Sequence, residues 1–125
     1  MNYAMNAYQK TAKAGDTPRQ IEAALLMKAA YRLKAVQDHW ETDRSDLDPA
    51  VIYNRKLWTI LATAATEADS PLPTDLKRNI AAIAIFIFNR SLDLIVDPKA
   101  SDLDALIDIN RNVASGLSVE PAVAA

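Results

Sequence analysis

The sequence predicts an all-α fold: a single-domain helical bundle of about four main helices, preceded by a short N-terminal helix. Half of the residues are hydrophobic, many of them alanine and leucine, and only two are glycines. Few runs alternate apolar and polar residues in the manner of a surface strand. Apolar residues instead recur at intervals of three and four, which is typical of helices that pack one face on a core. Such helices bury that face against one another in a bundle.

The most apolar stretch of the chain, residues 75–96, is expected to be the central buried helix. Every position from Ile80 to Phe88 is apolar, so a helix here has no solvated face. Other elements should therefore cover both of its sides. Its two apolar stripes consist of Leu76, Ile80, Ile83, Ile87 and Leu94 on one side and Ile85, Phe88, Leu92 and Val96 on the other.

Two alternatives for this stretch fit the sequence less well. Alternating Ile and Phe have high β propensity, but periodic sequence continues on both sides without Gly or Pro, which favours a helix over a buried strand. A membrane span requires roughly 18 apolar residues. The uncharged stretch, residues 79–89, is far shorter and has Lys77, Arg78 and Arg90 at its ends. We therefore expect no interaction with a membrane.

The first main helix has a clear starting signal. Before it, residues 1–16 form an N-terminal segment that is at best a marginal helix, because isolated helices of this length are unstable in water. Thr17, Pro18 and Gln20 have the pattern of an N-cap, a proline at the first helical position and the glutamine of a capping box. A single apolar seam then continues to about Trp40, which predicts one long helix.

The second main helix is expected between a charged loop and a proline-rich connection. Residues 41–48 are charged and show no periodicity, and Asp48 before Pro49 is a plausible N-cap. The helix should continue to about Thr66. Residues 67–73 contain two prolines and must separate it from the apolar helix that follows.

The last helix is expected to begin with a second capping box, formed by Ser101 and Asp104. Gly116 is expected to end it as the C′ residue. Residues 117–125 then form a small, apolar and flexible tail. No repeat or composition change divides the chain, so residues 1–125 are interpreted as one domain.

Few residues could support catalysis or hold a metal ion. His39 is the only histidine and there is no cysteine, so a site built from two imidazoles or from thiolates is excluded. Asp43, Asp46 and Asp48 suggest calcium ligands, but their loop lacks the central glycine and distal glutamate of an EF-hand. No phosphate-binding, dinucleotide-binding or nucleophile motif occurs. We expect no enzymatic activity, no cofactor and no metal.

The charge of the chain gives little support to nucleic-acid binding. The formal net charge is −2, whereas phosphate binding normally needs clustered Lys and Arg. Lys10, Lys13, Arg19, Lys28 and Arg32 could still form a local basic patch, so a regulator that binds RNA directly is an alternative from another class. The start of the chain has no basic and apolar leader, so secretion through a signal peptide is not expected.

The strongest candidate for a partner-binding site is the sequence around Trp58. Tyr53, Asn54, Arg55 and Trp58 place aromatics, an amide and a cation on adjoining helical faces, and such aromatic anchors are enriched at interfaces. We expect a groove between this helix and the N-terminal segment that carries Tyr8. The more ordinary interpretation of Trp58 is a core residue.

Four asparagines fall within or beside apolar stripes, and an unpaired buried amide costs roughly 1 to 3 kcal/mol. They are Asn54, Asn79, Asn89 and Asn110. The more ordinary expectation is that they pair with one another, with helix ends or with water. The functional alternative is contact with the backbone of a partner.

Eight short motifs, in order and over nearly the whole chain, resemble one known family. They are residues 6–13 (NAYQKTAK), 17–19 (TPR), 22–26 (EAALL), 53–59 (YNRKLWT), 71–73 (PLP), 77–80 (KRNI), 106–111 (LIDINR) and 116–117 (GL). The set is similar to the FlaF flagellar biosynthesis regulators. No single motif is specific, but their order and spacing are.

The resemblance implies a small, cytoplasmic, all-helical protein needed for flagellin production and secretion, and so for motility. It further implies a chaperone that binds the terminal helical segments of flagellin and works alongside the regulator FlbT. The alternative is an interaction module that acts through FlbT, or on translation of flagellin mRNA, without binding flagellin directly. Tyr8, Tyr53, Asn54, Arg55 and Trp58 are proposed contacts from residue type alone, because the resemblance supplies no contact residues.

Overall fold

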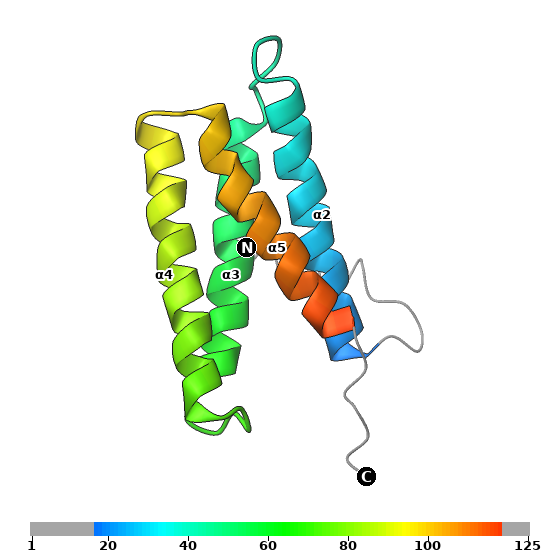
Figure 1. The fold of residues 1–125 in the computed structure, drawn as a ribbon, viewed down its shortest axis with the longest axis vertical. Coiled ribbons are helices and arrows are strands. Elements are labelled where there is room, and N and C mark those ends of the chain that lie inside the picture. Colours follow the sequence, from blue (N-terminus) through cyan, green and yellow to red (C-terminus); the bar gives the residue numbers. More distant parts are fainter. Residues whose placement is uncertain (1–16, 119–125) are drawn as a thin grey trace.

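The computed structural model describes residues 17–118, which form four α-helices and one 3₁₀ turn (Figure 1). The elements are α2 (Pro18–Asp38), α3 (Leu47–Thr66), α4 (Thr74–Val96), η1 (Ala100–Asp102) and α5 (Leu103–Ser118). The predicted all-α bundle is therefore confirmed. The short helix expected in residues 1–16 lies outside the described residues, as do residues 119–125.

Helix α2 begins where the sequence predicts it. The Thr17 hydroxyl oxygen accepts a hydrogen bond from the Gln20 backbone N–H at 3.2 Å, and the Gln20 side-chain oxygen accepts one from the Thr17 N–H at 2.8 Å. These two bonds are the predicted capping box, with Pro18 at the first helical position. Local residues alone therefore specify this helix start.

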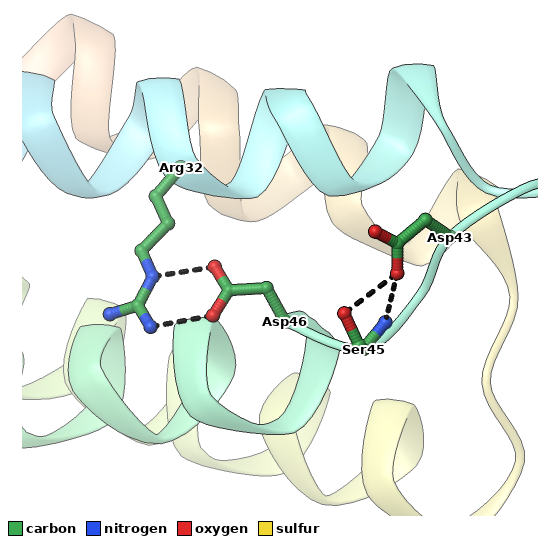
Figure 2. Close-up of polar contacts among 4 residues, drawn as sticks. All are labelled: Arg32, Asp43, Ser45 and Asp46. Carbon is green, nitrogen blue, oxygen red and sulfur yellow. Dashed lines mark hydrogen bonds and ion pairs between the residues drawn. The ribbon is translucent and has the colours of Figure 1, made fainter.

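Helix α3 begins earlier than the sequence predicts. Its first residue is Leu47 and its N-cap is Asp46, so the expected N-cap role of Asp48 is wrong. The reason is tertiary: the Asp46 carboxylate accepts two hydrogen bonds from the guanidinium of Arg32 on α2, both at 2.7 Å (Figure 2). This bidentate pair holds the chain against α2 at the point where α3 starts.

The ends of α5 also differ from the prediction. The chain enters it through η1, and the Asp104 carboxylate, instead of completing a capping box, accepts a hydrogen bond of 2.6 Å from Gln37 of α2. Gly116 is not a C′ residue, because the helix continues to Ser118. The Gly116 carbonyl accepts a hydrogen bond from Arg19 at 3.2 Å, so contacts with α2 accompany both ends of α5.

The helices contact one another in the order α5, α2, α3, α4. Helix α2 packs extensively on α5 and also on α3, while α4 packs mainly on α3 and touches α5 and η1 only slightly. Figure 1 shows α4 along one edge of the bundle and α5 crossing α2 obliquely. Helices α2 and α3 therefore each have a neighbour on two sides, whereas α5 and α4 lie at the two ends of this order.

The expectation that residues 75–96 form the central buried helix is wrong. The helix itself exists, but only Ala84, Ile87, Ser91 and Leu94 of α4 are buried. Hydrophobicity does not decide which helix becomes central, because close packing on two sides also needs small side chains at the contacts. Helix α2 supplies them with several buried alanines on its packing faces.

The connection between α2 and α3 is polar and internally hydrogen-bonded (Figure 2). The Asp43 carboxylate accepts hydrogen bonds from the Ser45 N–H at 2.9 Å and from the Ser45 hydroxyl at 2.7 Å. These bonds lower the pKa of Asp43, and the hydrogen bonds from Arg32 lower the pKa of Asp46. Both carboxylates are therefore stabilised in the charged form.

The edge position of α4 gives a matched pair of substitutions. Ile87 is 0% exposed and Ile85 is 59% exposed on the same helix. Ile87→Asp should lower the free energy of unfolding by about 3 to 5 kcal/mol, because it buries an unpaired charge. Ile85→Asp should change it by less than about 1 kcal/mol. Urea unfolding followed by circular dichroism measures both, and equal losses would contradict the edge position.

The Arg32–Asp46 pair predicts a pH dependence of stability. The pKa of Asp46 is lowered in the folded state, so its contribution is present above the unfolded pKa of about 4 and is lost as pH falls through the folded value. The pair is largely solvated, so Asp46→Asn should cost only about 0.5 kcal/mol at pH 7. Denaturation at pH 7 and pH 3 checks this, with Asp48→Asn as control, and an unchanged deficit at pH 3 would contradict it.

Candidate functional site

The structure separates the residues predicted to bind a partner. Tyr8 lies outside the described residues. Tyr53 is partly buried on α3, with the guanidinium carbon of Arg32 5.7 Å from its ring centroid, and burial raises the pKa of its hydroxyl. Asn54 and Trp58 point into the core, whereas Arg55 lies on a different face of α3 and is partly exposed.

Asn54 and Trp58 belong to a buried polar network around Asn110 of α5. The Trp58 indole N–H donates to the Asn110 side-chain oxygen at 2.8 Å, and the Asn110 amide donates to the Asn54 side-chain oxygen at 2.7 Å. The same amide reaches the carbonyl of Leu26 on α2 at 3.4 Å. In this structure the network joins α2, α3 and α5, and the role of Asn54 and Trp58 in partner binding stays a prediction.

The four asparagines therefore divide into two kinds. Asn54 and Asn110 are buried and pair with each other, as the more ordinary expectation holds, but the Asn54 side-chain N–H has no hydrogen-bond partner among the described residues. Asn79 and Asn89 on α4 are exposed, so solvent can satisfy their amides. Their position beside the apolar stripes reflects the edge position of α4.

A different feature meets the requirements of a binding surface: an open apolar groove between α3 and α4. Its volume is about 240 Å³. The hydroxyls of Thr59 and Thr66 donate to backbone carbonyls of their own helix, at 2.9 and 2.6 Å, so they need no polar partner from outside. The groove is lined by Thr59, Ala62, Thr63, Thr66, Ala81, Ala84, Ile85 and Phe88.

The exposed stripe of α4 continues this groove. Ile85, Leu92 and Val96 are 59%, 52% and 80% exposed and share one side of the helix, because their spacing of seven and four residues returns to the same face. Exposed apolar patches of this kind mark interaction sites. We call the groove-lining residues together with Leu92 and Val96 the α3–α4 surface.

The sequence alone contained the signal for this surface. The stripe with Ile85, Phe88, Leu92 and Val96 is one of the two that the sequence analysis identified. The sequence predicted the position of this stripe correctly, but it also led us to expect that another element of the same chain would pack over it. Phe88 of this stripe packs partly against the core, whereas Ile85, Leu92 and Val96 are not covered by any element among residues 17–118.

By length and composition, α4 could cross a membrane. The same test is also passed by core helices, but only 22% of the relevant window of α4 is buried. Several large apolar side chains of α4 are therefore exposed, among them Ile85, Leu92 and Val96. Arg90 and Asp93 interrupt the apolar stretch, and Arg90 forms an ion pair of 2.8 Å with Asp102 of η1.

Another hollow lies beside the α2–α3 connection. It includes Arg32, His39, Asp43 and Asp46 and has a volume of about 270 Å³. The His39 Nδ1 lies 3.0 Å from the Ala35 carbonyl of its own helix, and Asp46 is occupied by Arg32. Within the part of the chain that the structure describes, no three His, Asp or Glu side chains are grouped to hold a metal ion.

The buried network predicts a large effect for a single amide. Asn110→Ala should lower the free energy of unfolding by about 2 to 4 kcal/mol, because it leaves the Trp58 N–H unpaired and opens a cavity between three helices. Asn112→Ala, at an exposed position of the same helix, should stay within about 0.5 kcal/mol of the parent. Urea denaturation measures the free energy of unfolding of both variants. A loss for Asn110→Ala as small as that for Asn112→Ala would show that the fold does not need the network.

Comparison with known proteins adds one finding. No curated protein and no solved structure matches the chain. The family described as flagellar protein FlaF matches residues 4–117, which is nearly the whole chain and includes all four helices. The ordered motifs, the all-α bundle and this match agree, and the chain belongs to the FlaF family of flagellar proteins.

Proposed function

We propose that this flagellar protein is a chaperone that binds flagellin and supports its production and secretion. The observation that carries the proposal is the α3–α4 surface, where one side of a long apolar helix is left exposed among residues 17–118. A protein that must accept an apolar segment from a partner needs such a surface. Family membership gives the flagellar context.

The terminal segments of unassembled flagellin match this surface in kind. They become amphipathic helices in the filament, and their apolar faces invite premature association beforehand. An amphipathic helix can lay such a face into a groove between two helices, with anchors every three or four residues. The α3–α4 surface offers a groove of this form, with Ile85 and Phe88 in its wall.

Binding of this kind is expected to be reversible. The bound segment loses conformational entropy when it orders, which reduces the net affinity. Release is required because the flagellin must leave for export. We therefore place the protein in the cytoplasm, with flagellin as its partner and FlbT as a second partner of the same process.

The proposal predicts that substitutions on the α3–α4 surface weaken flagellin binding without unfolding the protein. Ile85→Asp and Leu92→Asp each place a charge where an apolar face should dock, so affinity for monomeric flagellin should fall at least tenfold. Tyr31→Asp is the matched control, because Tyr31 is an exposed apolar residue of α2, 63% exposed and away from the surface. Calorimetry at two salt concentrations measures binding, and circular dichroism monitors the fold.

Flagellin lacking either terminus identifies the bound segment. Saturable binding that is lost when one terminus of flagellin is removed supports the chaperone proposal and identifies that terminus as the segment that docks. If no form of flagellin binds, the proposal is wrong. Binding that appears only when FlbT is added would instead favour the interaction module that acts through FlbT.

A further inference from the structure

Two arginines stand at opposite ends of the α3–α4 surface. On α3, Arg55 precedes Thr59 by four residues and Ala62 by seven, so the three share one side of the helix. On α4, Arg78 precedes Ala81 by three residues and Ile85 by seven, which places it in line with that stripe. Each arginine thus continues one wall of the groove.

The antiparallel course of α3 and α4 puts the two cations far apart. A connection of seven residues joins the helices, which run side by side in opposite directions (Figure 1). Arg55 therefore lies toward the Leu92 end of the surface and Arg78 toward the Thr66 end. At 1.5 Å per residue, they are separated by about 20 Å along the groove, or about four helical turns.

Neither arginine is neutralised by the described part of the chain. Arg32 and Arg90 form ion pairs with Asp46 and Asp102, but Arg55 and Arg78 form none among residues 17–118. The acidic residues of α4 nearest in sequence, Asp75 and Asp93, lie about a quarter of a turn around the helix from the apolar stripe. Asp75, three residues before Arg78, adjoins it on the helix surface, but among residues 17–118 neither Arg55 nor Arg78 is held in an ion pair, so each guanidinium is available to a carboxylate of a partner.

We propose that the α3–α4 surface selects an amphipathic helix that carries acidic side chains at both ends of its apolar face, about fourteen residues apart. This inference rests on the proposed function and specifies the chemistry of the segment that docks. The apolar face fills the groove, while one carboxylate reaches Arg55 and the other reaches Arg78. Two such pairs fix the register of the bound helix and accelerate its association.

The pattern fits a helix better than an anionic membrane. A helix that lies on a membrane carries Lys and Arg along its whole polar face, whereas α4 has Asp75 and Asp93 at the rim of its exposed side. The hollow between α3 and α4 also suits side chains inserted at helical spacing, because its walls are formed by small residues such as Ala62 and Ala81.

The test uses three synthetic 18-residue helices that share one apolar face and differ only at two positions fourteen residues apart. The pair is Glu in the first peptide, Gln in the second and Lys in the third. For the parent protein, the Glu peptide should bind about tenfold more tightly than the Lys peptide at low salt, with the Gln peptide between them. In Arg55→Glu/Arg78→Glu the order should reverse.

The control variant has the same net charge as Arg55→Glu/Arg78→Glu, but its two substitutions lie outside the α3–α4 surface. Lys28→Glu/Arg111→Glu changes two exposed cations of α2 and α5, outside the α3–α4 surface. This variant should bind the Glu, Gln and Lys peptides in the same order of affinity as the parent does. Circular dichroism of both double variants should match the parent, so a change in order reports recognition and not folding.

The possible results separate this inference from the proposed function. The inference is overturned if the three peptides rank in the same order of affinity for the parent, the Arg55→Glu/Arg78→Glu variant and the control variant, or if their affinities do not differ. It is also overturned if anionic vesicles bind the protein while no peptide does. Titration of the parent with monomeric flagellin judges the proposed function on its own. If flagellin binds and the peptides show no preference, the chaperone stands and only the charge selection falls.

Discussion

The buried amide of Asn110 is the interaction on which the arrangement of the bundle depends. Apolar contacts hold helices together but tolerate sliding and rotation, whereas hydrogen bonds in a dry core have fixed directions. Asn110 accepts from Trp58, donates to Asn54 and reaches the Leu26 carbonyl, so one side chain joins α5 to both α3 and α2. Any shift of α5 along its neighbours would leave buried polar groups unpaired, which makes the observed register the favourable one.

This network also explains why α4 stays at the edge. The face of α3 that carries Asn54 and Trp58 is committed to α2 and α5, and only the remaining side of α3 is available to α4. Helix α4 buries Ile87 and Leu94 there, while Ile85, Leu92 and Val96 on its other side stay exposed among residues 17–118. The fold thus separates two functions of α3: one side organises the core, and the other, with Thr59 and Ala62, forms half of an open groove.

The open groove, the exposed stripe and the two unpaired arginines describe one surface with a consistent chemistry. Its centre is apolar and its ends are cationic, which suits a helix of the opposite pattern. In a protein without a partner, such an exposed apolar surface would favour aggregation. For a protein of the FlaF family, we propose that a flagellar partner docks there. The residues that line the groove include none of the side chains of the Asn110 network, so exposed positions such as Ile85 can be changed without removing a hydrogen bond of the core.

The sequence by itself determined the helices and their separation, the capping box at Thr17, the pairing tendency of the buried asparagines and the family. The helices, their separation and the capping box depend on residues within a few positions of one another, and the family depends on the order of motifs; the asparagine pairing follows from the need of any buried amide for a hydrogen-bond partner. Tertiary structure decided which helices have neighbours on two sides, why α3 starts at Leu47 with Asp46 as its N-cap, and which side of α3 carries Trp58 inward. An apolar stripe indicates that one side of a helix will be buried by some other element. Whether that element belongs to the same chain depends on packing against helices that are distant in the sequence, which a local pattern does not show.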